Sequence, residues 1–440
     1  MRYPILGRAA RPLSTRLPRF AGSIAQGGRR PAGRPRRRIH GHWPLSASSL
    51  ALLALLAVAL SLPTSAIGGG LPAASTAAAG APALVPPSLA LTPDVAAAPF
   101  GTAVAISGDT AAVTGRAGTR AVVFVFFRSS TGWAQQAALA DPAGSDPASP
   151  FGSALAISGD VLAVGAGAED AEVSSVYVYA RAGGSWSLQS HLQPGLASRL
   201  GFGTALALDG GTLVVGVPGT EYGDCAPGQA FIYVRAGSGW VRRAVLSAKS
   251  PAAADRYGRA VAIGHQHVVV GGPGFAEIFD PAGPTWQRTA VVQGAGAGTG
   301  FGSAVAASGE TVAVADPANQ TVSLFIHAAG SWFQQAEIAS PTGAAASVEF
   351  GSAIALSQDA LAVGAPATTD AGRQAGGAVY VYRKLRHRWL LEAGFALPAP
   401  AAGDRFGSAV AINLHTALAG SNTTSPVPTQ AWVIEGLDHP

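Results

Sequence analysis

A short motif, an aromatic residue followed by glycine, recurs seven times along most of this chain. The seven starts are Phe100-Gly101, Phe151-Gly152, Phe202-Gly203, Tyr257-Gly258, Phe301-Gly302, Phe350-Gly351 and Phe406-Gly407. They are 51, 51, 55, 44, 49 and 56 residues apart. A repeat of this length indicates one supersecondary unit that recurs and packs against its own copies.

Each unit carries the signals of four short strands. In the second unit, residues 153–157 form an apolar run, residues 158–160 (Ser-Gly-Asp) a tight turn, and residues 161–166 a second run that ends in small residues. After a variable loop, residues 176–179 alternate Val and Tyr, and Trp186 opens a fourth strand. β-branched and aromatic residues favour strands, whereas Gly, Ser and Asp favour the turns between them.

Four antiparallel strands repeated seven times predict an all-β fold, a seven-bladed β-propeller over residues 83–440. The small residues suit inner strands near the axis, and the aromatic residues suit outer strands that splay apart. The seventh unit shows strands only at 408–419 and 431–435. We therefore expect residues 83–91, which resemble a fourth strand, to complete the last blade. Pro86 and Pro87 in this segment would fit an outer edge strand.

Composition and charge exclude several classes of protein. Charged residues make up only 12% of the chain, and 57 Gly and 31 Pro favour short strands over long helices. Residues 1–43 hold 11 Arg and no acid, so the remainder has 18 basic and 24 acidic residues. The propeller is thus mildly acidic and gives no reason to expect nucleic-acid binding. The one cysteine, Cys225, excludes an intrachain disulfide framework, and we interpret it as a free thiol in a loop.

The N-terminal segment reads as a targeting sequence. Residues 1–43 are expected to be a disordered Arg-rich n-region, and residues 44–66 a signal peptide or signal-anchor with an uncharged core at 50–62. Residues 67–82 read as an Ala/Gly/Pro linker. The basic region is longer than a signal needs. The alternatives are that Met1 lies upstream of the real start, that the segment is a signal-anchor, or that it is an organellar transit peptide. We expect an extracellular or cell-surface protein, with membrane contact only if residues 45–62 are kept as an anchor.

These units resemble the FG-GAP repeat family, best known from the N-terminal propellers of integrin α subunits. The matching features are the seven Phe-Gly-like starts and the runs at 364–366 (Gly-Ala-Pro), 216–218 (Gly-Val-Pro) and 272–273 (Gly-Pro). The resemblance covers residues 83–440 and implies a binding or adhesion module for a protein or glycan. Several integrin blades carry an Asp-rich calcium loop after the first strand. Here each such turn has at most one carboxylate, so we expect no calcium, no other metal and no cofactor.

The candidate ligand-binding residues lie in loops between the second and third strands, because loops on a rigid scaffold carry function. The longest are residues 165–175, 217–229 and 365–377. Their charged and aromatic residues are Glu169, Asp170, Glu172, Glu221, Tyr222, Asp224, Asp370 and Arg373. For each of these taken alone we favour a solvated loop residue, but as a group they mark the best place for a ligand.

Two further pairs have a structural and a functional interpretation. Asp255-Arg256 and Asp404-Arg405 precede two repeat starts, and we favour an ion pair or turn cap between blades over a ligand contact. His265 and His267 would face the same side of an extended strand. They could begin a metal site, but no third ligand is evident nearby in the sequence.

Motifs of hydrolases, zinc proteases and P-loop enzymes are absent from the sequence, so no catalytic residue is expected. The preferred function is a non-catalytic recognition module that is secreted or displayed on the cell surface. The alternatives are a hydrolase or lyase with its site in the central channel, and an inert structural component of the envelope.

Overall fold

The computed structural model describes residues 83–440 except 145–148, 169–173, 196–200, 220–226, 251–255, 295–299, 344–347, 370–375, 402, 422–429 and 438–440. The chain divides into two units, Met1–Gly68 and Gly69–Pro440. The predicted n-region, signal and linker (1–43, 44–66 and 67–82) lie outside the described residues. Within the described ranges, we find no helix with the length and apolar character needed to cross a membrane.

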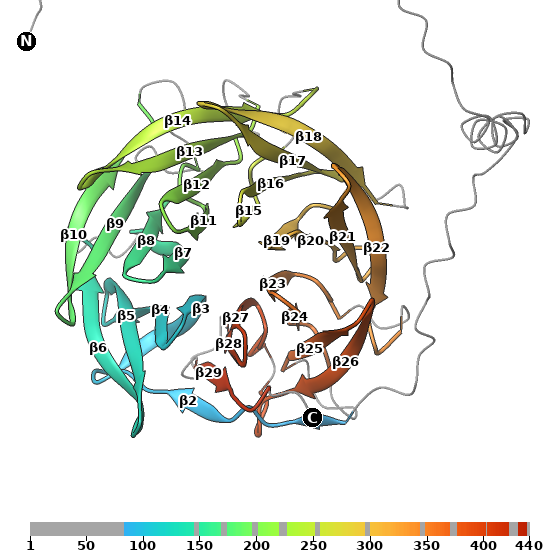
Figure 1. The fold of residues 1–440 in the computed structure, drawn as a ribbon. Helices are drawn as coiled ribbons and strands as arrows, with labels where there is room; N and C mark the ends of the chain where they lie inside the picture. The colour runs from blue at the N-terminus through green and yellow to red at the C-terminus, as the bar shows by residue number, and fades with distance from the viewer. Residues whose placement is uncertain are drawn as a thin grey trace, which may run out of the picture. The chain divides into compact units, whose positions relative to one another are not determined.

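Seven sheets follow one another around a ring (Figure 1), and the first six blades each contribute four consecutive antiparallel strands. The first three blades are β3 (Ala97–Ser107), β4 (Thr110–Ala117), β5 (Arg120–Ser129), β6 (Gly132–Ala140); β7 (Phe151–Ser158), β8 (Val161–Ala166), β9 (Ser175–Ala182), β10 (Ser185–Leu192); and β11 (Ala205–Asp209), β12 (Thr212–Val217), β13 (Gln229–Ala236), β14 (Gly239–Ser247). The next three are β15 (Val261–Gly264), β16 (His267–Gly272), β17 (Phe275–Ala282), β18 (Thr285–Gln293); β19 (Ala304–Ser308), β20 (Thr311–Asp316), β21 (Thr321–Ala328), β22 (Ser331–Ala339); and β23 (Ala353–Ser357), β24 (Ala360–Ala365), β25 (Ala378–Leu385), β26 (Arg388–Phe395). The predicted all-β, seven-bladed architecture is confirmed.

The N-terminal segment closes the ring by joining two blades. The seventh blade contains β27 (Ala409–Asn413), β28 (Thr416–Gly420) and β29 (Ala431–Ile434), and β2 (Leu89–Leu91) pairs antiparallel with β29 as its fourth strand. This confirms the predicted closure. In addition, β1 (Leu84–Val85) pairs parallel with β26 and widens the sixth blade to five strands.

The expectation of one proline-containing edge strand is wrong in detail. Pro86 and Pro87 lie between β1 and β2, in neither strand. Neither proline has an N–H to donate to a ladder, so the segment breaks there into two short pairings on neighbouring blades.

The hydrophobic core is formed by side chains that pack between adjacent blades. The seven aromatic residues that open the repeats are only 0–2% exposed. Phe350, for example, lies with Tyr380 and Trp389 of its own blade against Ala313 and Ala315 of the preceding one. Small inner residues and large outer aromatics therefore fill wedge-shaped gaps, as the sequence predicted.

The Phe-Gly and Gly-Ala-Pro motifs meet between blades. A Cβ added to Gly364 would lie 1.9 Å from the carbonyl oxygen of Gly407, which opens the next blade and has a φ of 89°. The corresponding glycines of four other blades, Gly165, Gly216, Gly271 and Gly420, approach the next Phe-Gly carbonyl in the same way. The two motifs thus recur in phase because each Gly of one blade leaves room for the backbone of its neighbour.

Candidate functional site

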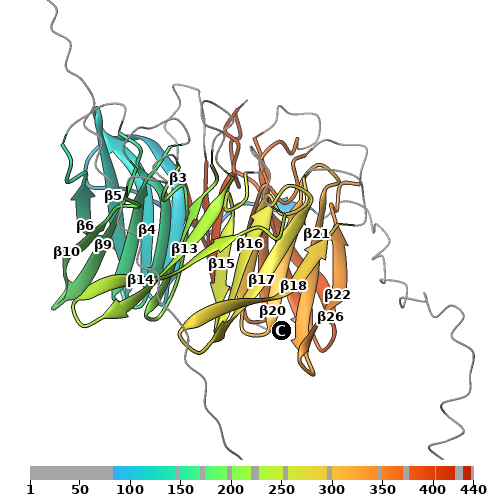
Figure 2. The ribbon, with the colours of Figure 1, turned by 90° about the horizontal axis from the view of Figure 1, so that it is seen from above.

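The two ends of the propeller are built differently (Figure 2). Antiparallel order places the turns between first and second strands, and between third and fourth strands, at one end, which we call the turn face. Each of the seven first turns has two residues, as between β7 and β8 or β19 and β20. The opposite end, the loop face, carries the connections between second and third strands and those between blades.

The connections on the loop face vary widely from blade to blade. Residues 273–274 suffice between β16 and β17, whereas residues 167–174, 218–228 and 366–377 connect the same strands in the second, third and sixth blades. Residues 421–430 make a fourth long connection, between β28 and β29, that the sequence reasoning did not single out. The sequence does contain a signal for it, because ten residues separate the small-residue run that ends at Gly420 from the strand that contains Trp432.

The predicted ligand residues all belong to these loops but lie outside the described residues. They are Glu169, Asp170, Glu172, Glu221, Tyr222, Asp224, Asp370 and Arg373. The structure therefore fixes the ends of their loops and leaves the eight residues as a prediction.

The Asp-Arg pair before the seventh blade has the structural role that we favoured. The Asp404 carboxylate accepts a hydrogen bond from the backbone N–H of Ala401 at 2.6 Å and so caps a turn. Arg405 forms an ion pair with Glu349, which holds the equivalent position in the sixth blade, at 2.5 Å. Asp255 lies outside the described residues.

On the turn face, a polar contact that we call the interblade node recurs between blades. In the second blade, Arg181 donates to the turn carboxylate of Asp160 at 2.7 Å and to the hydroxyl of Thr110, in the first blade, at 2.8 Å. The same guanidinium lies over Trp186 at 5.3 Å. Arg128 repeats the arrangement with Asp109, Thr416 of the seventh blade and Trp133.

We expect Asp160→Asn to lower the free energy of unfolding by no more than about 1 kcal/mol. The Asp160 side chain is 67% exposed, and exposed ion pairs contribute little because water screens them. Chemical denaturation of the full chain measures the change. If the free energy of unfolding fell by several kcal/mol, the node would not be the weak contact that its exposure indicates.

Between the fourth and fifth blades, the same node is built from different side chains. His327 takes the position of the arginine, Glu310 that of the turn aspartate, and His267 that of the preceding blade's threonine. Glu310 Oε2 lies 2.9 Å from His327 Nδ1 and 3.1 Å from His267 Nε2. Ligand atoms of the three residues all lie within 4.8 Å of one another.

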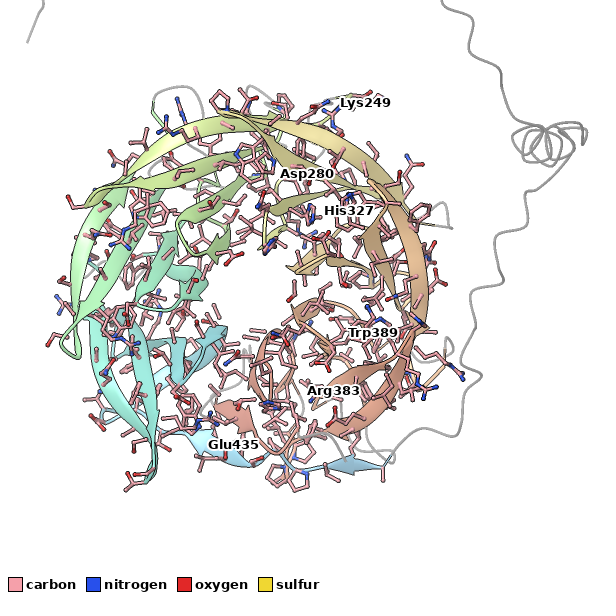
Figure 3. The ribbon with its side chains drawn as sticks, in the orientation of Figure 1. Lys249, Asp280, His327, Arg383, Trp389 and Glu435 are labelled. Carbon is pink, nitrogen blue, oxygen red and sulfur yellow. The ribbon has the colours of Figure 1, made fainter. Side chains whose placement is uncertain are left out.

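A fourth polar side chain and an aromatic ring complete this cluster. Asp280, directly across the β16–β17 ladder, holds His267 Nδ1 at 2.6 Å. Figure 3 labels Asp280 and His327, which belong to adjacent blades. The Trp332 ring lies 4.9 Å from that of His267 and 5.1 Å from that of His327.

Burial and charge differ across the cluster. The His267 side chain is 8% exposed, that of His327 25% and that of Glu310 52%, so the carboxylate forms the solvent side. The pKa of Glu310 lies below its ordinary value because its carboxylate accepts hydrogen bonds from His327 and His267. The cluster thus holds an ionised carboxylate between two imidazoles, a donor set that suits a divalent transition metal.

The predicted pairing of His265 with His267 is wrong. His265 is an exposed turn residue with a φ of 61°, whereas His267 begins β16 and is buried. The chain reverses between them, so the two rings do not share one face of a strand. The partners of His267 come from the next blade.

The described turns do not fit the calcium loops of integrin blades. Each has two residues, and the carboxylates of Asp109, Asp160 and Asp359 already face arginines. Calcium needs six to eight oxygen ligands, which a turn of this length with one acid does not supply.

Comparisons with known proteins identify the repeat. A family model described as FG-GAP repeat matches residues 332–382, from the fourth strand of the fifth blade to the third strand of the sixth. No curated protein matches the chain.

Among solved structures, Saccharomyces cerevisiae Sqt1 is 12% identical with a TM-score of 0.46, and covers 81% of this chain and 92% of its own. A Lactobacillus plantarum protein is 12% identical with a TM-score of 0.47, at 69% and 86% coverage. A Bacteroides uniformis protein named "putative 6-phosphogluconolactonase" is 13% identical with a TM-score of 0.45, at 72% and 92% coverage. Likenesses this low carry no information about activity or ligand.

Proposed function

Because the chain is a β-propeller of FG-GAP repeats, we propose that it is a non-catalytic binding module. In this proposal it is secreted or held at the cell surface and recognises a protein or a glycan through its loop face. The basic segment, short apolar core and small-residue site of residues 1–66 support export.

The contrast between the two faces carries the proposal. The turn face repeats the same two-residue turns, whereas on the loop face the connections between second and third strands range from two residues to twelve (273–274 and 366–377). A rigid closed scaffold with variable loops at one end is the arrangement that binding proteins use. The acidic and aromatic residues predicted in these loops would supply polar contacts and a stacking surface.

The inner strands support binding over catalysis in the central channel. β11 reads Ala-Leu-Ala-Leu-Asp and β23 reads Ala-Ile-Ala-Leu-Ser, with few groups able to transfer protons or attack a substrate. Among the described residues, one group of three His, Cys, Asp or Glu side chains converges, and it lies between the fourth and fifth blades. An enzyme would need its acids or histidines gathered where a substrate can enter.

Loop substitution tests the proposal. Residues 169–173, 220–226 and 370–375 are replaced, one segment at a time, by Gly/Ser sequences of equal length in the full chain. The probes are an array of immobilised glycans and an extract of cell-surface proteins. We expect a partner retained by the wild type to bind at least about ten-fold more weakly to one or more loop variants.

Asp160→Asn, on the opposite face, is the matched control and should bind as the wild type does. The proposal fails if nothing is retained above background, or if every loop variant retains the partner as well as the wild type.

A further inference from the structure

The cluster of His267, Glu310 and His327 differs from the other interblade nodes in a way that changes its chemistry. Where Arg181, Asp160 and Thr110 make a contact held by a permanent cation, this node has two imidazoles and a carboxylate. Two of the three positions hold histidine instead of threonine and arginine, and the third keeps a carboxylate, so all three side chains are of types that bind metals. An ionic contact alone would need none of these replacements.

From this geometry we propose that the fourth and fifth blades share a binding site for a divalent transition metal of the zinc class. His267 Nε2, Glu310 Oε2 and His327 Nδ1 are its ligands. The ion would link β16 of the fourth blade to the β19–β20 turn and β21 of the fifth.

The distances suit such an ion. With metal–ligand bonds of about 2.0–2.1 Å, two ligands of a tetrahedral zinc lie about 3.3 Å apart. Glu310 Oε2 now lies 3.1 Å from His267 Nε2 and 2.9 Å from His327 Nδ1. Both histidine nitrogens thus converge on one oxygen, and each would move only a few tenths of an ångström from that oxygen to reach the spacing of a zinc site. The three ligand atoms all lie within 4.8 Å of one another.

Asp280 provides independent support. A histidine that ligates a metal commonly donates its other ring N–H to a carboxylate, which fixes its tautomer and aims the free nitrogen at the ion. His267 is held in this way, with Nδ1 at 2.6 Å from Asp280 Oδ1. The corresponding positions in the second and third blades are Ala180 and Val234, whereas the seventh blade has an acid there as well, Glu435 across from Thr416. Only in the fourth blade does this acid face a histidine.

The site is open to solvent on one side, where an ion can enter, and is covered by an aromatic ring on another. Glu310 is 52% exposed and lies at the solvent edge, where a water molecule can supply a fourth ligand. Trp332, from β22, packs against both imidazole rings. Calcium and magnesium are disfavoured because both prefer oxygen ligands to imidazole.

Isothermal titration of metal-free full-length protein with Zn²⁺ tests the proposal. We expect one site of micromolar affinity or tighter, together with a rise in Tm on zinc addition. His267→Ala and Glu310→Gln should each weaken binding by at least about 100-fold. Asp280→Asn should weaken it by about ten-fold or more, because Asp280 positions His267 without touching the ion.

A triple variant separates metal binding from a purely structural role. His267→Thr, Glu310→Asp and His327→Arg together copy the node of the second blade, so the variant should fold as stably as the metal-free wild type. It should show no zinc-dependent rise in Tm. His265→Ala, two residues from His267 but outside the site, should bind zinc as the wild type does.

Cobalt gives a spectroscopic check. Co²⁺ in place of zinc should show the visible absorption bands of a tetrahedral nitrogen and oxygen site in the wild type and none in the triple variant. The proposal is overturned if the wild type binds zinc only weakly and without stoichiometry. It is equally overturned if the triple variant keeps the site, or if His265→Ala abolishes it.

Discussion

Gly364→Ala should destabilise the propeller by about 3 kcal/mol or more, since an added methyl group in a packed interior forces the backbone to move. The new Cβ would lie 1.9 Å from the carbonyl oxygen of Gly407, which belongs to the backbone of the next blade. That carbonyl cannot rotate away without disturbing the start of the seventh blade. Chemical denaturation followed by tryptophan fluorescence measures the loss.

Gly211→Ala is the matched control for this prediction. Gly211 lies in the turn before β12, and the nearest atom to an added Cβ is the Cβ of Arg235 at 3.6 Å, an ordinary contact. Its free energy of unfolding should stay within about 0.5 kcal/mol of the wild type. Equal effects at Gly364 and Gly211 would show that the two motifs do not lock neighbouring blades together.

Arg383→Met should cost about 3 kcal/mol or more, because it removes one partner of a buried ion pair. The Arg383 side chain, labelled in Figure 3, is only 6% exposed. Its Nε lies 2.9 Å from Glu392, and its two terminal nitrogens donate to the carbonyl oxygens of Leu414 and Leu437. The guanidinium thus ties the sixth blade to the seventh, and its loss removes a donor from two carboxylates, Glu392 and Asp359, and from two carbonyls.

Arg388→Met controls for the loss of a positive charge from the same blade. Arg388 begins β26 and is exposed, so its replacement should change the free energy of unfolding by less than about 0.5 kcal/mol. If Arg383→Met proved no more harmful than Arg388→Met, the buried contact would contribute nothing to the joint between these blades.

The fold was predictable because its signals repeat in phase. An isolated alternating run such as residues 176–179 is weak evidence for a strand, but the same order in seven units identifies the blade. Leu84 and Val85 were expected to belong to one strand over residues 83–91, and their separate pairing with the sixth blade as β1 was missed, because two residues are too few for any periodicity. The parallel pairing of β1 with β26 depends on the position of the sixth blade in the closed ring, which the local sequence does not specify.

The cluster between the blades was harder to predict because its residues are far apart in sequence. His267 lies 43 residues before Glu310, and His327 follows Glu310 by 17. The histidine nearest to His267 in sequence is His265, which lies on the other side of a chain reversal and does not face the cluster. Aligning the repeats position by position could have found the set, since His267, Glu310 and His327 fall on columns that hold Thr, Asp and Arg in other units.

The loops could not be placed by the same reasoning. Their residues have no counterparts in other repeats, and no period constrains them. The repeats therefore specify a uniform scaffold, and we propose that specific function lies where one repeat departs from the others. The loops are one such place, and the junction of the fourth and fifth blades is the other.

An anomalous difference map at the zinc edge, from crystals of the full chain grown with Zn²⁺, would locate an ion bound at the proposed site. We expect a peak between His267 Nε2, Glu310 Oε2 and His327 Nδ1, and no peak at the Arg181–Asp160 node of the second blade. In crystals of the Glu310→Gln variant the peak should vanish. Zinc found only elsewhere on the surface, with the three side chains still bonded directly to one another, would contradict the account.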